Sequence, residues 1–281
     1  LYLFNNLIKK KGTVITDSTI PQFKKIKKVV DKKKLKLLTI QNSNADLELV
    51  SHKYEDDYQI LIIKEKNKKK FIRLNLYLIG KIQVKNILMA ILAATRSGLN
   101  INSIAKSIMK LRPAEGRLEK IGIIKNNSKV ILDYAHTPDA LETILTNIKE
   151  QFPLKKIRLV FGCGGDRDKS KRKKMGKIAS KFADIIYLTD DNPRSENPKK
   201  IRNDIKKGIR TKNIKEISNR RIAINNCIND LCSGDIAIVA GKGHEKTQDY
   251  NGKKIFLSDR KEILKSIKLK NDKLFKDIRL N

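Results

Sequence analysis

The stretch IRLVFGCGGDRDKSKRKKMGKIASKF, residues 157–182, contains a short apolar run, a glycine-rich loop and a segment of helix length. The run at 157–162 is rich in β-branched and aromatic residues, which predicts a strand. Residues 171–182 form an amphipathic segment that predicts a helix. The three glycines at positions 162, 164 and 165 allow the backbone to approach a ligand closely. The stretch therefore predicts a strand, a candidate functional loop and a helix in succession.

The same order of elements recurs on both sides of this stretch. Further strand-like runs lie at residues 130–134, 184–189 and 236–241, and helix-length segments lie at residues 138–151, 198–209 and 220–231. Strand, loop and helix in rotation are typical of an α/β fold with a doubly wound, mostly parallel sheet. Because such sheets bind ligands at the carboxyl ends of their strands, the loops after the strands are the places to look for chemistry.

The first part of the chain has a different pattern of predicted strands and helices. It mixes strand-like runs with two helical stretches, the strands at residues 36–40, 58–63 and 71–78 and the helices at residues 84–97 and 102–111. With 281 residues the chain is long enough for two ordinary domains. We expect one domain at residues 1–111 and a second, Rossmann-like domain at residues 112–281.

The charge of the chain is strongly positive, with 63 Lys and Arg residues against 30 Asp and Glu residues and a net charge of +33. Such a charge usually indicates binding to nucleic acid or anionic lipid. Here the lysines are spread along the whole sequence, and no zinc-finger spacing or RNP-like aromatic box accompanies them. No apolar run approaches the roughly 20 residues of a membrane span. We therefore expect solvated lysine faces, with neither nucleic acid nor membrane as a partner.

The cysteines indicate a reducing compartment. Cys163, Cys227 and Cys232 form no C-x-x-C pair and fit no disulfide framework. We expect each of them to be a small packed residue and the protein to be cytoplasmic.

Charged and glycine residues gather in the four loops that follow the predicted strands, at residues 133–138, 162–169, 190–194 and 241–245. A single loop of this kind is most often a turn with a helix cap. Four of them on one edge of a sheet indicate a binding site. Arg167 and Arg194 offer planar guanidinium groups for a carboxylate or phosphate, and Glu245 offers an anion for an ammonium group. Together these residues suit a zwitterionic amino-acid ligand.

The same loops carry a resemblance to a known family. The blocks are GKIQVKNILMAILAA (80–94), EGRLE (115–119), DYAHTPDALE (133–142), VFGCGGDRDKSKR (160–172), TDDNPRSENP (189–198), NRRIAI (219–224) and AGKGHEKTQ (240–248). Their order and their sequences resemble those of the Mur ligase family of peptidoglycan synthesis, and within it the members that add meso-diaminopimelate. The match extends over nearly the whole chain from residue 80.

The resemblance implies a parent of three domains, which bind a uridine nucleotide, hydrolyse ATP and bring the incoming amino acid. Residues 1–111 would be the end of the central ATPase domain, and residues 112–281 would be the C-terminal Rossmann-like domain. No G-x-x-x-x-G-K-[ST] phosphate loop occurs in the 281 residues. We therefore expect the phosphate loop upstream of Leu1 and the chain by itself to be inactive as a ligase.

The resemblance also implies the reaction. ATP, with Mg²⁺, would phosphorylate the side-chain carboxyl of the D-glutamate in UDP-N-acetylmuramoyl-L-alanyl-D-glutamate, and the amine of meso-2,6-diaminopimelate would attack the acyl phosphate. We also expect the protein to be a monomer in the cytoplasm. Lysine lacks the distal carboxylate of diaminopimelate and would leave a guanidinium unpaired, so Arg194 is expected to discriminate between them.

By motif position the resemblance assigns three groups of residues. The diaminopimelate site would comprise Arg167, Asp191, Asn192, Pro193, Arg194, Gly241 and Glu245. The nucleotide would be contacted by Asn86, Arg117 and Asp133. His136 would orient the acyl phosphate, and Lys242 would add positive field near phosphate. His136 could equally be a helix-start histidine bonded to the backbone, and Lys242 a solvated lysine.

Three alternatives stay open at this point. A lysine-adding member of the family is disfavoured by Arg194 in DNPR, and a folylpolyglutamate synthetase is disfavoured by the GCGGDRD and AGKGHE blocks together. A non-catalytic basic remnant that binds anions is the alternative from a different functional class.

Overall fold

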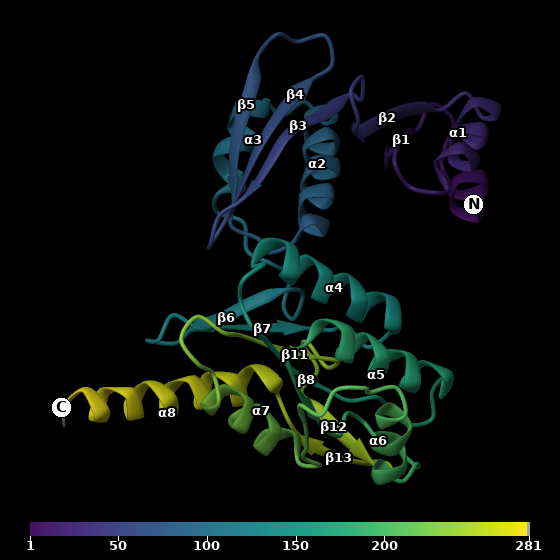
Figure 1. The fold of residues 1–281 in the computed structure, drawn as a ribbon. Helices are drawn as coiled ribbons and strands as arrows, with labels where there is room; N and C mark the ends of the chain where they lie inside the picture. The colour runs from purple at the N-terminus through teal and green to yellow at the C-terminus, as the bar shows by residue number, and fades with distance from the viewer. Residues whose placement is uncertain (280–281) are drawn as a thin grey trace. The chain divides into compact units, whose positions relative to one another are not determined.

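In the computed structural model of the protein, the backbone is described for residues 1–279 and the side chains for residues 1–273. The chain divides into two compact units, Leu1–Arg112 and Pro113–Asn281. Figure 1 colours the first unit purple to blue and the second teal, green and yellow. Each unit is built around a sheet and a hydrophobic core of its own.

The first unit contains a five-stranded mixed sheet with the strand order β1-β2-β3-β4-β5. The pairs β1–β2 and β2–β3 are parallel, whereas β3, β4 and β5 form an antiparallel meander. Its strands are β1 (Thr13–Asp17), β2 (Lys36–Gln41), β3 (Leu47–Tyr54), β4 (Gln59–Glu65) and β5 (Phe71–Leu76). Its helical segments are the π-helix η1 (Leu3–Leu7) and the α-helices α1 (Phe23–Lys32), α2 (Lys81–Arg96) and α3 (Ile101–Ile108).

The core of the first unit lies between the sheet and α2. β4 buries alternate residues, among them Leu61 and Ile63, as a strand does when one face meets a core. α2 buries Leu88 and Ile91 on one helical face, and both belong to the same cluster. α1 is not among the helices predicted from the sequence, although its buried residues Ile26 and Val30 recur at helical spacing.

The second unit contains a six-stranded sheet with the order β10-β9-β8-β11-β7-β6, parallel except for the antiparallel edge pair β6–β7. Its strands are β6 (Glu119–Ile123), β7 (Lys129–Asp133), β8 (Ile157–Phe161), β9 (Ile185–Leu188), β10 (Ile214–Glu216) and β11 (Ile236–Ala240). A separate hairpin consists of β12 (Thr247–Tyr250) and β13 (Lys253–Phe256). Its helices are α4 (Pro138–Gln151), α5 (Ser170–Phe182), α6 (Pro198–Lys206), α7 (Arg220–Asn229) and α8 (Asp259–Arg279).

The strand order places a topological switch at the centre of this sheet. After β7 the chain passes through α4 to β8 and then moves outward to β9 and β10. It returns through α7 and inserts β11 between β7 and β8. Open α/β sheets bind ligands at such a point, outside the carboxyl ends of the strands.

The three central strands are buried along their whole length. Every residue of β7, β8 and β11 is buried, which is expected when helices cover both faces of a parallel sheet. Figure 1 shows α4, α5 and α6 on one side of the sheet and α7 with α8 on the other. On the latter side Ile224, Cys227 and Ile263 pack in one cluster with Val130 and Val239 of the sheet.

These observations confirm the predicted fold class, an α/β protein with a doubly wound, mostly parallel sheet after residue 112. The four strands and four helices predicted for this region are present within a few residues of their expected ends. The sequence pattern does not predict β6, the short edge strand β10 or the β12–β13 hairpin. In the part of the chain that the structure describes, no helix is both long and apolar enough to cross a membrane.

Candidate functional site

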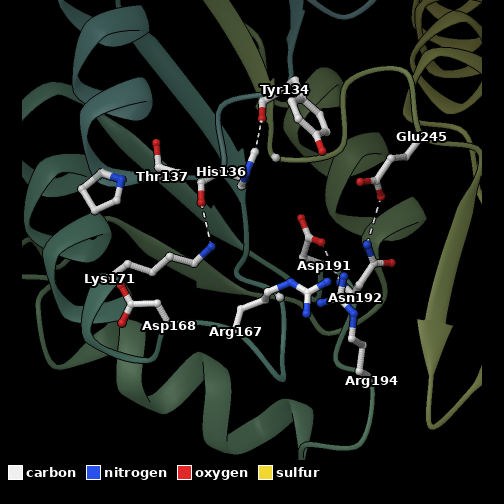
Figure 2. Close-up of a pocket in the computed structure, with 13 residues that line it drawn as sticks. Tyr134, His136, Thr137, Arg167, Asp168, Lys171, Asp191, Asn192, Arg194 and Glu245 are labelled. Carbon is white, nitrogen blue, oxygen red and sulfur yellow. Dashed lines mark hydrogen bonds between the residues drawn. The ribbon is translucent and has the colours of Figure 1, made fainter. Parts of the chain in front are cut away.

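The loops after β7, β8, β9 and β11 meet at one edge of the second sheet and line a pocket of about 430 Å³ (Figure 2). The loop after β7 contributes Tyr134, His136, Thr137 and Pro138, and the loop after β8 with the start of α5 contributes Gly164, Arg167, Asp168 and Lys171. The loop after β9 contributes Asp191, Asn192 and Arg194, and the loop after β11 contributes Gly241 and Glu245. The pocket therefore lies at the topological switch, and charged groups of both signs face it.

The loop after β7 is shaped by the start of α4. The Thr137 hydroxyl accepts a hydrogen bond from the N–H of Ala140 at 3.3 Å, and Pro138 occupies the first helical turn. The exposed ring of His136 has its Nδ1 atom 2.9 Å from the carbonyl oxygen of Tyr134. Because a carbonyl oxygen only accepts, Nδ1 carries the proton in this contact, and Nε2 is left as an acceptor in the neutral ring.

Two glycines let the loops after β8 and β9 pack backbone against backbone. A Cβ atom on Gly162 would lie 2.2 Å from the carbonyl oxygen of Thr189, and one on Gly165 would lie 1.9 Å from that of Pro193. The N–H of Gly165 also donates to the carbonyl of Asn192 at 2.9 Å. Side chains at these two positions would push the loops apart, so glycine is required there for the pocket to have its present width.

A buried ion-pair network around Arg172 ties α5 to the same loops. The Arg172 side chain is 0% exposed and donates to Glu196 at 2.8 Å and to Asp204 at 3.2 Å. Glu196 also accepts a hydrogen bond from the N–H of Asp166 at 2.7 Å. The hydrogen bond from Arg172 holds the pKa of Glu196 below its usual range. The network thus anchors the loop that carries Arg167.

Besides Lys171, the positive side of the pocket consists of Arg167 and Arg194, which come from different loops (Figure 2). Arg194 has a left-handed backbone with a φ of 52°, and its Nη1 donates to the carbonyl of Gly165 at 2.7 Å. This contact orients the guanidinium group and leaves other N–H groups for a ligand. Arg167 is exposed, and its Nη1 donates to the carbonyl of its neighbour Asp166 at 2.9 Å.

Besides Asp168, the negative side of the pocket consists of Asp191 and Glu245. One oxygen of Asp191 accepts from the N–H of Asn192 at 2.7 Å. One oxygen of Glu245 accepts from Nδ2 of Asn192 at 2.9 Å and from Nζ of Lys242 at 2.8 Å. Among the residues whose side chains are described, no hydrogen bond reaches the other oxygen of either carboxylate. Each carboxylate therefore has one oxygen left for a cationic ligand group.

The β12–β13 hairpin holds the loop after β9 from behind, and the sequence pattern does not predict this contact. The Gln248 side chain donates to the carbonyls of Asp190 and Asp191 at 3.2 and 2.6 Å. The Tyr250 hydroxyl lies 3.0 Å from a carboxylate oxygen of Asp190, which also pairs with Arg202. Gln248 is the last residue of the AGKGHEKTQ block, and its membership of that block is the sequence feature that could have indicated its role.

The remaining predicted diaminopimelate residues, Pro193 and Gly241, differ in their positions. Pro193 is buried and faces Gly165 through its carbonyl, without lining the pocket. Gly241 lines the pocket with a φ of 116°, and a Cβ atom there would lie 2.7 Å from a carboxylate oxygen of Asp191. A side chain at position 241 would therefore cover that oxygen.

The residues predicted to contact a nucleotide lie in both units. In the second unit, the Arg117 guanidinium lies 4.6 Å from the centre of the Tyr134 ring, so it stacks beside the pocket. Asp133 is 5% exposed, and its two carboxylate oxygens accept from the N–H groups of Leu118 and Ala135, both at 2.7 Å. Burial raises the pKa of Asp133. Asn86 is an exposed residue of α2 in the first unit.

The two residues predicted to be catalytic are also placed differently. His136 lines the pocket, and its own carbonyl accepts from Nζ of Lys171 at 2.8 Å. Lys242 is fully buried behind Glu245, so the alternative of a solvated lysine is wrong. Pocket residues that the sequence pattern does not single out are Tyr134, Thr137, Asp168 and Lys171.

The cysteine in the glycine-rich loop is a packing residue. Cys163 is buried, and its Sγ lies 3.5 Å from the sulfur of Met175. Burial raises the pKa of the Cys163 thiol to about 12. A thiol in this state is neutral at physiological pH and a poor nucleophile or metal ligand.

Comparisons with known proteins agree on one family. Residues 116–243 match the family described as "Mur ligase, glutamate ligase domain". Over 270 residues the chain is 37% identical to the UDP-N-acetylmuramoyl-L-alanyl-D-glutamate--2,6-diaminopimelate ligase of Rickettsia montanensis, covering 96% of this chain and 55% of that protein. It is 46% identical over 199 residues to the protein of the same name from Buchnera aphidicola, covering 70% and 39% of the two chains.

A solved structure of a ligase with that name superposes with a TM-score of 0.69 at 30% identity, covering 92% of this chain and 53% of that one. A folylpolyglutamate synthase from Thermotoga maritima superposes with a TM-score of 0.63 at 21% identity, a likeness that concerns the fold alone. The chain spans about half the length of the curated relatives it matches.

Proposed function

The chain belongs to the Mur ligase family, and we propose that it is part of an ATP-dependent ligase that joins meso-2,6-diaminopimelate to UDP-N-acetylmuramoyl-L-alanyl-D-glutamate. The relatives that are 36–46% identical are named for this pair of substrates. In this proposal the second unit of the chain binds the incoming amino acid, and the product is a precursor of peptidoglycan.

One observation carries the choice of amino acid, namely the balance of charge in the pocket. Two guanidinium groups, on Arg167 and Arg194, and two carboxylates, on Asp191 and Glu245, line the same cavity. The lining also contains Lys171 and Asp168, which already have partners, since Lys171 donates to the carbonyl of His136 and Asp168 accepts from the N–H of Ser170, both at 2.8 Å. Meso-diaminopimelate has two carboxylates and two ammonium groups, so each charged group of the ligand has a counterpart. Lysine has two ammonium groups but one carboxylate, and it would leave one guanidinium without a partner.

Within this pocket Arg194 is assigned to the distal carboxylate and Arg167 to the other. The Arg194 guanidinium is oriented by the Gly165 carbonyl and so is prepared for a bidentate contact. Arg167 is exposed and can close over a ligand from the rim. The ammonium groups are assigned to Glu245 with Asn192 and to Asp191, with Gly241 leaving room beside the latter. Pro193 acts through its contact with Gly165, which sets the width of the pocket.

The reaction follows from the chemistry of an acyl phosphate. ATP transfers a phosphoryl group to the side-chain carboxyl of D-glutamate, and the uncharged amine of diaminopimelate then forms a bond to the carbonyl carbon. The C–O bond to phosphate breaks, the amine loses a proton, and phosphate leaves. The protein contributes chiefly by holding the amine and the acyl group in contact. His136 is assigned to this region, because its Nε2 is an acceptor at the pocket surface.

We assign the nucleotide contacts to Arg117 and Asn86, with Asp133 in a supporting role. Arg117 presents its guanidinium on the Tyr134 ring beside the pocket. The carboxylate of Asp133 accepts two backbone N–H groups, one of them from Leu118 directly after Arg117. Asp133 thereby holds the segment that carries Arg117. Asn86 would meet the adenine from the first unit, as residues 1–111 would be the end of the ATPase domain and residues 112–281 the amino-acid domain.

The proposal extends to Mg²⁺, to a monomer and to the cytoplasm, all of which the family resemblance implies. The described residues contain no group of three or more His, Cys, Asp or Glu side chains that could hold a metal ion. The described residues therefore do not fit a metal site, and no step is assigned to Mg²⁺ here. Light scattering of the purified chain would measure its oligomeric state, and a dimer would contradict that part of the proposal.

Isothermal titration of the 281-residue chain with meso-diaminopimelate and with L-lysine tests the substrate. We expect saturable binding of meso-diaminopimelate and at least about tenfold weaker binding of lysine, because lysine strands a guanidinium. Equal affinities would favour a lysine-adding ligase and overturn the assignment. Binding of polyphosphate in place of either amino acid would favour the non-catalytic basic protein.

A further inference from the structure

Lys242 is a cation enclosed within the binding site. It lies in the loop after β11, between Gly241 and Gly243, and its side chain is 0% exposed. Lysine is rarely buried without partners, because removing an ammonium group from water costs several kcal/mol. The side chain must therefore be compensated by the groups around it, and these groups belong to the pocket wall.

The Lys242 ammonium group bridges Asn192 and Glu245. Its Nζ donates to Oδ1 of Asn192 at 3.0 Å and to Oε2 of Glu245 at 2.8 Å. The backbone N–H of Asp249 donates to the same Asn192 oxygen at 3.0 Å. Three elements of the second unit therefore converge on one amide: the loop after β9, the loop after β11 and strand β12.

These contacts determine which way the Asn192 amide faces. Two donors, from Lys242 and Asp249, point at one end of the amide, so that end must be the oxygen. The amide nitrogen then points at Glu245 and donates to Oε2 at 2.9 Å. A flipped amide would place its NH₂ against an ammonium group and an N–H, and Glu245 would lose the hydrogen bond from Asn192.

The same contacts set the orientation of Glu245. Its Oε2 accepts from both Lys242 and Asn192, whereas Oε1 accepts no hydrogen bond from the described residues. The Glu245 side chain is 32% exposed and lines the pocket, while Lys242 does not. One carboxylate oxygen is therefore held from behind by a buried cation, and the other is presented to whatever occupies the pocket.

We propose that Lys242 is a positioning residue that holds Asn192 and Glu245 in the orientation that receives an ammonium group of the amino-acid substrate. The inference deepens the proposed function and rests on it for the identity of the substrate. This inference replaces the expectation that Lys242 acts on phosphate. To reach the pocket, Nζ of Lys242 would have to give up its hydrogen bonds to Asn192 and Glu245 and leave the protein interior.

The test uses Lys242→Met, which keeps the length and apolar stem of the side chain but removes the three donors. Lys246→Met is the matched control, since Lys246 lies in the same loop, is exposed and carries the same charge. Titration of the 281-residue chain with meso-diaminopimelate should show roughly 10- to 100-fold weaker binding for Lys242→Met. Lys246→Met should stay within about twofold of the wild type.

Pimelate separates positioning from a general loss of structure. It has the carbon chain and both carboxylates of diaminopimelate but no ammonium group, so it engages Arg167 and Arg194 alone. Lys242→Met should bind pimelate as well as the wild type does. Equal weakening toward pimelate and diaminopimelate would mean that Lys242 merely supports the fold, and the inference would be wrong.

If the wild-type chain binds no diaminopimelate, that result counts against the proposed function and leaves the role of Lys242 to be tested by structure. A crystal structure of Lys242→Met provides that test. We expect the Glu245 carboxylate to leave its wild-type position or the Asn192 amide to lose its contact with it. If Asn192 and Glu245 kept their positions and their 2.9 Å contact, Lys242 would not position them.

Discussion

The backbone N–H of Arg194 donates a 2.9 Å hydrogen bond to the carbonyl of Asp249, which lies in strand β12, 55 residues along the chain. The carbonyl of Arg194 in turn accepts from the N–H of Asn251 at 2.7 Å. These two contacts form a parallel bridge between Arg194 and Tyr250. They stabilise Arg194 in a left-handed conformation that non-glycine residues seldom adopt. The β12–β13 hairpin thus fixes the backbone of Arg194, and the carbonyl of Gly165 orients its guanidinium group.

Removal of that guanidinium should discriminate between two substrates. Arg194→Ala should weaken meso-diaminopimelate binding roughly 10- to 1,000-fold, or about 1.5 to 4 kcal/mol, because a charge-assisted contact to the distal carboxylate is lost. Lysine has no such carboxylate, so its affinity should change little or improve. Titration calorimetry measures both, with the exposed Arg210→Ala as a control of equal charge. Equal losses for the two amino acids would make Arg194 a scaffold residue.

Removal of the Glu245 charge should weaken the binding of both amino acids, in contrast to the selective effect of Arg194→Ala. Glu245→Gln should weaken binding of both diaminopimelate and lysine by roughly tenfold or more, because each presents an ammonium group to this carboxylate. The exposed Glu55→Gln, in the first unit, is the control for a lost negative charge. Calorimetry with both amino acids again provides the measurement. Unchanged lysine affinity would show that Glu245 faces a part of diaminopimelate that lysine lacks.

A side chain at Gly165 should separate two loops of the pocket. In Gly165→Ala the new Cβ would meet the Pro193 carbonyl oxygen at 1.9 Å, a distance that backbone atoms cannot tolerate. We expect a loss of about 1 to 3 kcal/mol in the free energy of unfolding, with weaker diaminopimelate binding. In the control Gly122→Ala the nearest atom is the flexible Cδ1 end of Ile267 at 2.9 Å, so the cost should be small. Urea unfolding compares the two variants, and equal stabilities would contradict the close approach of the loops.

The buried Arg172 network should make stability depend on pH in the acid range. Its hydrogen bond to Glu196 lowers the pKa of that carboxyl from the usual 4.5. A lowered folded-state pKa contributes stability that is present above the unfolded value and is lost as the pH falls through the folded value. The wild type should therefore lose stability as the pH falls below about 4.5.

Glu196→Gln tests this assignment, because it removes the titrating group and keeps its shape. The variant should be less stable than the wild type near neutral pH, and the difference should shrink as the pH falls below about 4.5. Urea unfolding across that range measures the difference. A gap between the two proteins that stayed constant with pH would show that Glu196 does not titrate against Arg172.

Much of the second unit could be predicted from local patterns. The strand at 157–162 and its glycine-rich loop are visible because apolar and β-branched residues end abruptly at glycines and charges. The convergence of the four loops follows from the parallel arrangement, since the carboxyl ends of such strands share one edge. Arg167, Asn192, Arg194 and Glu245 could therefore be placed together before any coordinates were known, and the structure does bring them into one pocket.

The sequence by itself determined the central strands and the helices of the second unit, their order and the chemical groups in the loops, because hydrophobic periodicity, glycines and helix caps act over a few neighbouring residues. The tertiary structure alone decided three things: the insertion of β11 between β7 and β8, the clamp of the β12–β13 hairpin on Arg194, and the burial of Lys242 behind Glu245. Each depends on contacts between residues far apart in the chain. The sequence left two interpretations of Lys242 open, a residue that acts near phosphate and a solvated lysine, and only the packing of distant segments shows its ammonium group buried against Asn192 and Glu245.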